Sequence, residues 1–310
     1  YRYNSSPTFT GSVSDGWSSA AAQKLAQDEG LRARRSWLFL DDGIASLITH
    51  ATSNSTNPVL TTVANQNLAD GEQIFVTTKP GPKGVPGGSV PLGSMCADGG
   101  SNWRADAITS IHHNHSSYFI HADSANARVH IDCSRLTGDY SRISTNPGNA
   151  SGRLFRISIE HALTSGEQIG FAVLPNQDNA SASGVTMKGS DVAHVLSNHS
   201  AGIASMVFWA AGKANVALSS AHPQLSVAVN APCLLLLKGS DKALAVSASN
   251  PDRPDLKLRV TVEGSVSGSA TCDLPGGDRM GQSVNCSSSF RWRDASKSDD
   301  AAATPIPLQR

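Results

Sequence analysis

The chain has 310 residues, about twice a typical domain, which predicts two domains. Its 25 lysine and arginine residues balance 25 aspartate and glutamate residues, which argues against a protein that holds nucleic acid or an anionic membrane by bulk positive charge. Charged residues make up 16% and hydrophobic residues 39% of a sequence rich in serine, threonine and glycine, a composition typical of secreted β proteins.

The main secondary-structure signal is a series of short segments in which apolar and polar residues alternate, separated by clusters of Gly, Pro, Asn and Ser. Such a series is typical of an antiparallel β-sandwich. Residues 17–29 depart from it and favour a helix by propensity. Residues 80–93 contain four prolines and five glycines, and we expect a long loop there. Strands are expected at 37–41, 59–63, 73–77, 117–122, 128–132, 153–161, 168–174, 192–196, 224–229, 243–247 and 256–262.

A polar segment rich in Gly and Ser, residues 176–190, marks the expected domain boundary. We predict a larger domain over 1–180, a smaller one over 190–295 and a loosely held tail over 296–310. The longest apolar run, residues 201–212, is too short for a bilayer, which needs about 20 residues, so no membrane partner is expected. Because Tyr1 is neither an initiator Met nor part of a leader, we expect a processed chain or a piece of a longer one.

The cysteines and the glycosylation acceptors indicate the compartment. Cys272 and Cys286 flank a turn rich in Gly and Pro and form the first candidate disulfide; Cys96 with Cys133 is the second, and Cys233 lies in an apolar run as a buried free thiol. Asn-X-Ser/Thr acceptors, which favour a secreted extracellular glycoprotein, stand at Asn4, Asn54, Asn114, Asn149, Asn179, Asn198 and Asn285.

No segment carries a complete catalytic or metal-binding motif. His113, His115 and His121 would share one side of an unbroken strand, but exposed imidazoles on a strand are common and a glycan at Asn114 would lie among them, so no metal site is predicted. Asp41 and Asp42 end an apolar strand with their side chains on opposite faces, which excludes a carboxylate pair. No catalytic residue and no cofactor is predicted, and the sequence does not decide whether calcium binds.

The only tight cluster of basic residues is Arg32, Arg34 and Arg35. It could hold a polyanion such as an acidic polysaccharide. The alternative is a solvated strand edge.

Several segments, in order, resemble the β part of polysaccharide lyase family 8, the hyaluronate, chondroitin and xanthan lyases. Residues 9–16 and 33–42 resemble the family's FxGGVSDG and ARKSWFxFDD strands, and 61–66 and 113–119 resemble its TTxxNQ and HDNxGYxF stretches. Residues 159–161 and 171–175 resemble INHG and YAYxxLPG. Residues 195–198, 231–237 and 246–251 resemble the small C-terminal sandwich.

The resemblance implies an all-β fold: a large antiparallel supersandwich like that of galactose mutarotase, followed by a smaller antiparallel sandwich. It also implies that the Asn, His, Tyr and Arg that act on the uronate lie in a helical toroid that is not in this chain. Removing the C5 proton of a uronate requires a group that neutralises its carboxylate, a base and an acid in one cleft. No matched position supplies any of these groups.

Three functions remain open. The first is the β part of a secreted lyase that cleaves acidic polysaccharide by β-elimination, beside a separate toroid chain or after proteolysis; loops of this chain would then hold sugar rings. Asn65, Gln66, Trp103 and Arg104 are the candidate substrate-binding residues, although Trp103 could equally pack a loop. The second is a stand-alone lectin-like protein, and the third a purely structural extracellular glycoprotein.

Overall fold

The protein is described from a computed structural model. Its described residues are 9–26, 30–69, 72–79, 89–91, 101–122, 127–139, 148–164, 166–175, 184–219, 224–240, 243–253, 256–286 and 290–292. Asn4, Asn179, Cys96 and the predicted tail lie outside them.

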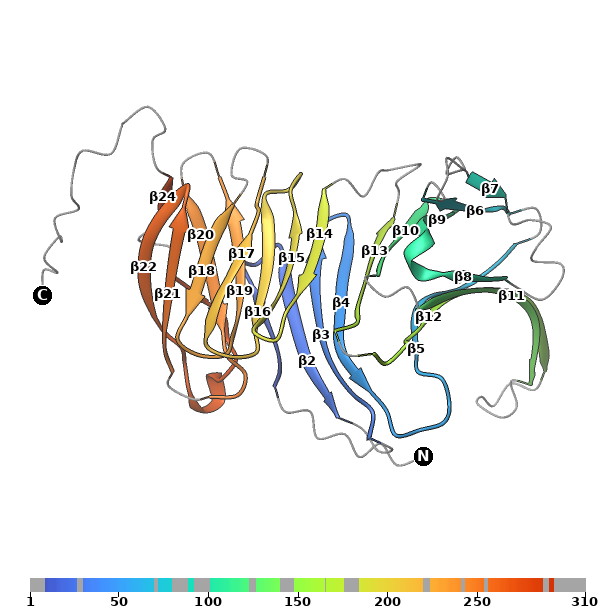
Figure 1. The fold of residues 1–310 in the computed structure, drawn as a ribbon, viewed down its shortest axis with the longest axis horizontal. Helices are drawn as coiled ribbons and strands as arrows, with labels where there is room; N and C mark the ends of the chain where they lie inside the picture. The colour runs from blue at the N-terminus through green and yellow to red at the C-terminus, as the bar shows by residue number, and fades with distance from the viewer. Residues whose placement is uncertain are drawn as a thin grey trace, which may run out of the picture.

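A nine-stranded antiparallel sheet lies at the centre of the molecule (Figure 1). Hydrogen bonds join its strands in the order β1-β2-β3-β4-β13-β10-β9-β6-β7. The bounds are Thr10–Ser14 (β1), Ser19–Ala26 (β2), Arg32–Leu40 (β3), Gly43–Thr52 (β4), Gln168–Pro175 (β13), Ser116–Ala122 (β10), Ile108–His113 (β9), Ile74–Thr78 (β6) and Ser89–Pro91 (β7).

A four-stranded sheet, ordered β5-β12-β11-β8, covers one half of the nine-stranded sheet. Its strands are Leu60–Asn67 (β5), Asn149–Glu160 (β12), Arg128–Asp139 (β11) and Ser101–Arg104 (β8), and the short 3₁₀ helix η3 (Ala105–Ala107) follows β8. The core between these two sheets contains Ile111, Tyr118, Phe155 and Ile157, all at most 1% exposed.

A six-stranded sheet, ordered β14-β15-β16-β19-β20-β23, packs on the other half of the nine-stranded sheet and on its opposite face. Its second face packs on a five-stranded sheet, ordered β17-β18-β21-β22-β24. The six strands are Val185–Gly189, Ala193–Asn198, Ile203–Phe208, Cys233–Gly239, Leu244–Ser249 and Val284–Asn285. The five strands are Gly212–Val216, Leu225–Val229, Lys257–Gly264, Val266–Asp273 and Arg291–Trp292, and the 3₁₀ helix η5 spans Gly277–Arg279.

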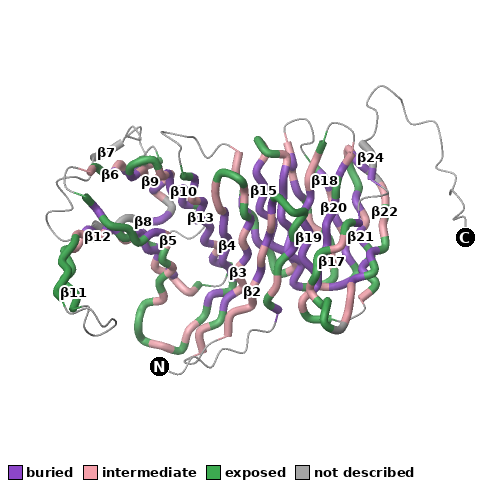
Figure 2. The backbone as a smooth tube through the Cα atoms, turned by 180° about the vertical axis from the view of Figure 1, so that it is seen from behind, coloured by how far each residue is buried: buried purple, intermediate pink, exposed green. Residues whose placement is uncertain are grey.

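Strands β10 and β13 are buried on both faces, because the two halves of the nine-stranded sheet overlap there. On β10, Tyr118 and Ile120 belong to the core shared with the four-stranded sheet, whereas Phe119 belongs to the core shared with the six-stranded sheet. Figure 2 shows these strands in the colour of buried residues, and the far part of β11 in that of exposed ones. A strand covered on both faces needs apolar residues at consecutive positions, which both strands have.

The predicted all-β class is confirmed, and every segment expected to be a strand overlaps an observed one. The helix expected at 17–29 is wrong: its described part contains β2, which pairs with β1 and β3 and buries Ala20 and Ala22. Pairing on both sides outweighs alanine's helix propensity. Within the loop expected at 80–93, residues 89–91 form β7 and the rest lies outside the described residues. Asp41 and Asp42 do not end a strand but form the turn between β3 and β4.

The predicted disulfide between Cys272 and Cys286 is present. Cys133 is also disulfide-bonded, and its expected partner Cys96 lies outside the described residues. Cys233 is a buried free thiol, as predicted, and burial raises the pKa of that thiol. The described part of the chain has no helix with the length and hydrophobicity that crossing a membrane requires.

A buried histidine joins the nine-stranded and six-stranded sheets. The His194 ring, fully buried, has Nδ1 2.9 Å from Ser36 Oγ on β3 and Nε2 2.7 Å from Thr49 Oγ1 on β4. Trp209 packs edge-on against it, with ring centroids 5.0 Å apart. Burial, with the positive charges of Arg34 and His50, lowers the pKa of His194 to about 3, so the ring is neutral in the folded protein at neutral pH.

The same junction separates the three arginines that were candidates for a polyanion patch. Arg34 Nη1 donates to the Asp191 carbonyl at 2.8 Å, and its guanidinium lies over Trp209. Arg35 lies over the Trp37 ring instead, 4.9 Å from its centroid. The arginines therefore do not form one patch, because successive β3 side chains point to opposite faces.

Close backbone approach keeps β14 against the nine-stranded sheet. The Gly189 N–H donates to Gln168 Oε1 at 2.7 Å. A Cβ at Gly189 would lie 2.7 Å from Thr49 Cγ2, so only glycine fits this approach.

A second buried polar cluster joins β5, β12 and the segment before β13. His161 Nε2 and Thr61 Oγ1 are 2.8 Å apart, and His161 Nδ1 is 3.4 Å from Glu167 Oε2, with both side chains 2% exposed. The Ala162 N–H donates to Glu167 Oε1 at 2.8 Å and the Leu163 N–H to Oε2 at 3.2 Å. Burial alone would raise the pKa of Glu167, but the hydrogen bonds from His161 and these N–H groups outweigh it and lower the pKa.

We predict that His194 makes the folded protein less stable as the pH falls from 6.5 towards 3. In this range the unfolded chain binds a proton that the folded ring, with its pKa of about 3, does not. The free energy of unfolding should fall by up to about 1.4 kcal/mol per pH unit from this group. Urea unfolding at pH 7, 6 and 5 should show a shallower dependence in H194Q. H199Q, in which a half-buried histidine changes, should keep the wild-type slope, and equal slopes in all three proteins would refute the assignment.

We predict that Glu167→Ala lowers the free energy of unfolding at pH 7 by about 3 kcal/mol, because it removes the ion-pair partner of buried His161 and leaves two partly buried N–H groups without their acceptor. The pKa of Glu167 in the folded protein lies below the ordinary value of 4.5, so its contribution to stability is present above pH 4.5 and is lost as the pH falls through the folded pKa. The difference from wild type should therefore shrink below pH 4.5. A difference that is constant with pH would contradict this. The exposed Glu263→Ala serves as control.

Candidate functional site

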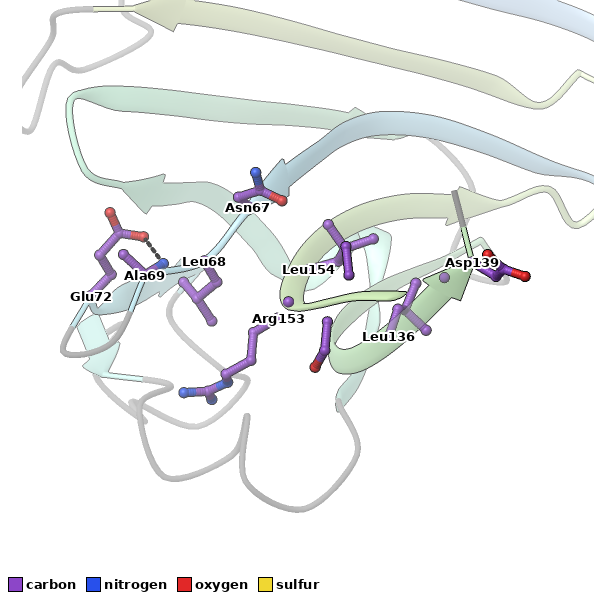
Figure 3. A pocket seen from close by; sticks show the side chains of 12 residues that line it. Asn67, Leu68, Ala69, Glu72, Leu136, Asp139, Arg153 and Leu154 are labelled. Carbon is purple, nitrogen blue, oxygen red and sulfur yellow. Dashed lines mark hydrogen bonds between the residues drawn. The ribbon is translucent and has the colours of Figure 1, made fainter. Parts of the chain in front are cut away.

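One groove of the described structure lies at the far end of the four-stranded sheet. It has a volume of about 680 Å³ and opens between the end of β5, the segment that follows it, and the β11–β12 hairpin (Figure 3). Polar and apolar side chains both line it: Asn67, Leu68, Glu72, Leu136, Asp139, Ser151, Arg153 and Leu154. We call it the hairpin groove.

The hairpin forms the groove because it extends beyond the neighbouring strands β5 and β8. β11 and β12 pair along their whole length, from Arg128 opposite Glu160 to Asp139 opposite Asn149. β5 stops pairing at Leu154, and β8 stops at Ile131. The remainder projects as a two-stranded ribbon, which twists more strongly than a wide sheet and curves at this end of the molecule (Figure 1).

Glu72 forms one side of the groove and is held by three donors. The Ala69 N–H donates to Oε2 at 2.8 Å, Asn114 Nδ2 donates to Oε1 at 2.7 Å, and His113 Nε2 lies 3.1 Å from Oε2. His113 is 1% exposed, packs on the Phe155 ring, and has its Nδ1 3.3 Å from Gln66 Oε1. The cluster thus connects the groove to both sheets of the larger sandwich.

These contacts make Glu72 a poor catalytic base. The hydrogen bond from Asn114, then that from the Ala69 N–H, lower the pKa of Glu72. A carboxylate with a lowered pKa accepts a proton from substrate weakly at neutral pH. Glu72 is therefore better suited to hold the groove wall in place, through its three hydrogen-bond donors, than to take up a proton.

Two arginines lie directly opposite each other on the hairpin next to the groove. Arg135 on β11 pairs with Arg153 on β12, so their side chains share a face. Arg153 lines the groove, and Arg135 Nε donates to the groove residue Ser151 Oγ at 3.0 Å. Neither guanidinium has a carboxylate partner in the described part of the chain. Like charges in this position are unfavourable, and a bound anion would relieve the repulsion.

The candidate substrate-binding residues do not form one site. Gln66 on β5 points inward, where its Oε1 lies 3.3 Å from His113 Nδ1 on β9, and the neighbouring Asn67 lines the groove, whereas Asn65 pairs with Arg156 on the outer side. Trp103 and Arg104 lie on β8, at the opposite edge of the four-stranded sheet. Three strand spacings, about 14 Å, separate the two edge strands. Their role in binding sugar stays a prediction.

The three histidines considered for a metal are separated by a turn. β9 ends at His113, Asn114 and His115 form the turn with Asn114 at a φ of 52°, and His121 is exposed near the end of β10. The unbroken strand on which the three histidines would share one side is therefore not present. Asparagine is among the few residues that adopt this left-handed conformation readily. Among the residues that the structure describes, no group of three or more His, Cys, Asp or Glu is placed to hold a metal ion.

The described glycosylation acceptors differ in exposure. Asn54, Asn114, Asn149 and Asn285 are exposed. Asn198 is 7% exposed, and its Oδ1 accepts hydrogen bonds from the Ser200 and Ala201 N–H groups. Occupancy of these acceptors stays a prediction.

Sequence reasoning missed Glu72, Arg135 and Arg153. Glu72 precedes a short strand and carries no local pattern. The arginines belong to strands whose alternation was recognised, but only the register of β11 against β12 brings them together. A sequence shows each strand and not which residues face each other across two of them.

Comparison with known proteins identifies the fold. The model of the polysaccharide lyase family 8 super-sandwich domain matches residues 1–185, and that of the family's C-terminal β-sandwich domain matches residues 188–256. No curated protein sequence matches the chain significantly.

Solved lyase structures share the fold at low identity. A chondroitinase AC lyase studied as oligosaccharide complexes has a TM-score of 0.70 at 18% identity, over 90% of this chain and 39% of that one. The Streptomyces coelicolor A3 chondroitin AC lyase, in a mutant form, has 0.66 at 18%, over 92% and 36%. A Paenibacillus xanthan lyase has 0.71 at 15%, over 97% and 30%.

The chain therefore spans 30% to 39% of the length of these lyases. The first model covers the larger sandwich, and the second covers the C-terminal sandwich from residue 188 to 256, in the order in which the two sandwiches follow along the chain. The chain belongs to polysaccharide lyase family 8.

Proposed function

We propose that this chain is the β part of a lyase that cleaves uronate-containing polysaccharide by β-elimination, and that the hairpin groove contacts the polysaccharide. Membership of the family supports the reaction class. Structural neighbours include a chondroitin AC lyase in complex with chondroitin sulphate, an acidic polysaccharide.

The observation that carries the role of the groove is the arginine pair. Arg135 and Arg153 bring two positive charges to one face beside a groove of about 680 Å³. A guanidinium binds carboxylate or sulfate through two parallel N–H donors. Leu68, Leu136 and Leu154 supply apolar surface for the carbon–hydrogen faces of sugar rings.

The groove is proposed to bind and orient substrate rather than to transfer protons. β-Elimination needs a group that neutralises the uronate carboxylate, a base for the C5 proton and an acid for the leaving oxygen. Arg153 could serve the first need, but Glu72 is held by three donors and has a lowered pKa. We propose that a helical toroid, in the same protein or in a separate chain, supplies the base and the acid.

The activity is tested on the protein isolated from its source, with any accompanying chain. It is incubated with hyaluronan, chondroitin and xanthan, and ultraviolet absorbance follows the unsaturated uronate product. Product from one of these polymers supports the proposal. Absence of product from all three, together with saccharide binding by this chain alone, would overturn it in favour of the stand-alone lectin-like function.

We predict that Arg153→Gln weakens binding of an acidic oligosaccharide about tenfold, the effect of losing one charge-assisted hydrogen bond. Arg135→Gln should act in the same direction, and the loss should diminish at high salt. Isothermal titration with a chondroitin sulfate hexasaccharide measures both.

Arg156→Gln is the matched control for this prediction. Arg156 lies on the same strand but on the opposite face, where its Nη2 is 2.7 Å from Asp132 Oδ2. It should bind as wild type. If Arg156→Gln weakens binding as much as Arg153→Gln does, the groove is not the binding surface.

We further propose that the protein is secreted and glycosylated. The disulfide between Cys272 and Cys286 and the disulfide-bonded Cys133 support an oxidising compartment, where such bonds persist. Treatment of the native protein with an endoglycosidase that removes N-glycans should lower its mass. Exposed acceptors such as Asn54 and Asn149 should be occupied before the buried Asn198. An unchanged mass would contradict the glycosylation.

A further inference from the structure

A second groove lies where the larger sandwich meets the C-terminal sandwich. It has a volume of about 460 Å³, within the range of ligand sites. Three parts of the molecule line it: His121 and Gln168 at the ends of β10 and β13, Thr186, Lys188, Ser197 and His199 from β14, β15 and the turn after it, and Asn215 on β17. We call it the junction groove. β14 lies in the middle of the molecule and the β11–β12 hairpin at one end (Figure 1), so the two grooves are separate.

The junction groove exists because two sheet edges face each other. β14 is the edge strand of the six-stranded sheet and β17 that of the five-stranded sheet, so the C-terminal sandwich is open along this side. In the β14–β15 register, Thr186 pairs with Ser197 and Lys188 with Val195, which places all four on the face directed into the opening. The ends of β10 and β13 close the groove from the larger sandwich.

The charge of the lining has one sign. Lys188 and the imidazoles of His121 and His199 line the groove, and no aspartate or glutamate is among its lining residues. Lys188 is exposed and has no carboxylate partner among the described residues. A lysine in a concave surface without an acidic neighbour attracts an anion.

Hydroxyl groups beside the lysine are already oriented. Ser197 is 1% exposed, and its Oγ lies 2.7 Å from Thr186 Oγ1, which is 3.5 Å from His199 Nε2. The wall beside them is stiff, because Gly189 and Gln168 hold β14 against the larger sandwich through the close approach described above. Donors fixed before binding lose little entropy when a ligand arrives.

We propose that the junction groove binds the anionic group of an acidic saccharide, a sulfate or a carboxylate, with Lys188 pairing the charge and Thr186 and Asn215 bonding the sugar's hydroxyls. The site lies in a different part of the fold from the hairpin groove and does not depend on the function proposed for that groove. A protein with both sites would hold two parts of one polysaccharide.

The experiment measures binding at the junction groove with the hairpin groove weakened. In the full protein carrying Arg135→Gln and Arg153→Gln, titration calorimetry is performed with three hexasaccharides: chondroitin sulfate, unsulfated chondroitin and neutral maltohexaose. We expect both acidic saccharides or the sulfated one alone to bind, which identifies carboxylate or sulfate as the recognised group. Neutral maltohexaose should bind much more weakly.

Two further substitutions in this background locate the site. Lys188→Gln should weaken binding about tenfold and Thr186→Val about threefold, the sizes expected for a charged and a neutral hydrogen bond. Lys257→Gln, at an exposed lysine at the start of β21, is the control and should bind unchanged. Lys188→Gln and Lys257→Gln should keep the unfolding temperature, because these side chains are exposed, whereas Thr186→Val should lower it slightly, because the buried Ser197 hydroxyl loses its partner.

The proposal is overturned if maltohexaose binds as well as the acidic saccharides, if no saccharide binds in this background, or if Lys188→Gln behaves as Lys257→Gln does. These outcomes are separate from a failure of the proposed function. That function is judged by the unsaturated product and by the effect of Arg153→Gln in the otherwise wild-type protein.

Discussion

The whole structure depends on one sheet being buried on both faces. The nine-stranded sheet packs on the four-stranded sheet with one half and on the six-stranded sheet with the other, and β10 and β13 serve both cores. Because Tyr118 and Phe119 are neighbours that point into different cores, a one-residue shift of β10 would expose apolar residues to the wrong partner on each side. The register of β10 therefore fixes how the two sandwiches are placed relative to each other, and with them the two grooves.

Buried polar groups then define how the layers are oriented. His113, His161 and His194 each join segments that are far apart in sequence. The partners of His113 lie on β5 and before β6, those of His161 on β5 and before β13, and those of His194 on β3 and β4. Apolar packing tolerates small sliding, whereas a buried hydrogen bond lost by sliding costs about 1–3 kcal/mol. Several segments through which the chain resembles its family contain these groups, for example Gln66 and His161. In this chain those motifs therefore contribute to the framework that joins the layers.

Alternation along single strands was enough to predict the all-β class and the position of eleven strands, because burial of one sheet face imposes a period of two. The prediction from alternation was wrong for β2, because its alanines, which pack tightly between β1 and β3, have a high helix propensity. Alternation did not reveal the turn of Asn114 and His115, where no glycine or proline marks the chain reversal. The candidate site was less predictable still. Gln66 was found through the resemblance, but Arg135 and Arg153 meet only through the register of β11 with β12.

Although the net charge of the chain is zero, the fold places some basic side chains next to acidic partners and others without them. Outward-facing Arg156 is neutralised by Asp132 across β11 and β12, whereas Arg135 and Arg153 on the same strands have no acidic partner in the described structure. Lys213 pairs with Glu263, while Lys188 in the junction groove has no acidic partner among the residues that the structure describes. Screening weakens electrostatic attraction beyond about 8 Å at physiological salt, so what an acidic polysaccharide meets is decided by such local imbalance and not by the overall charge. A balanced composition therefore argues against bulk attraction to polyanions and remains compatible with specific contacts to an acidic sugar at each groove.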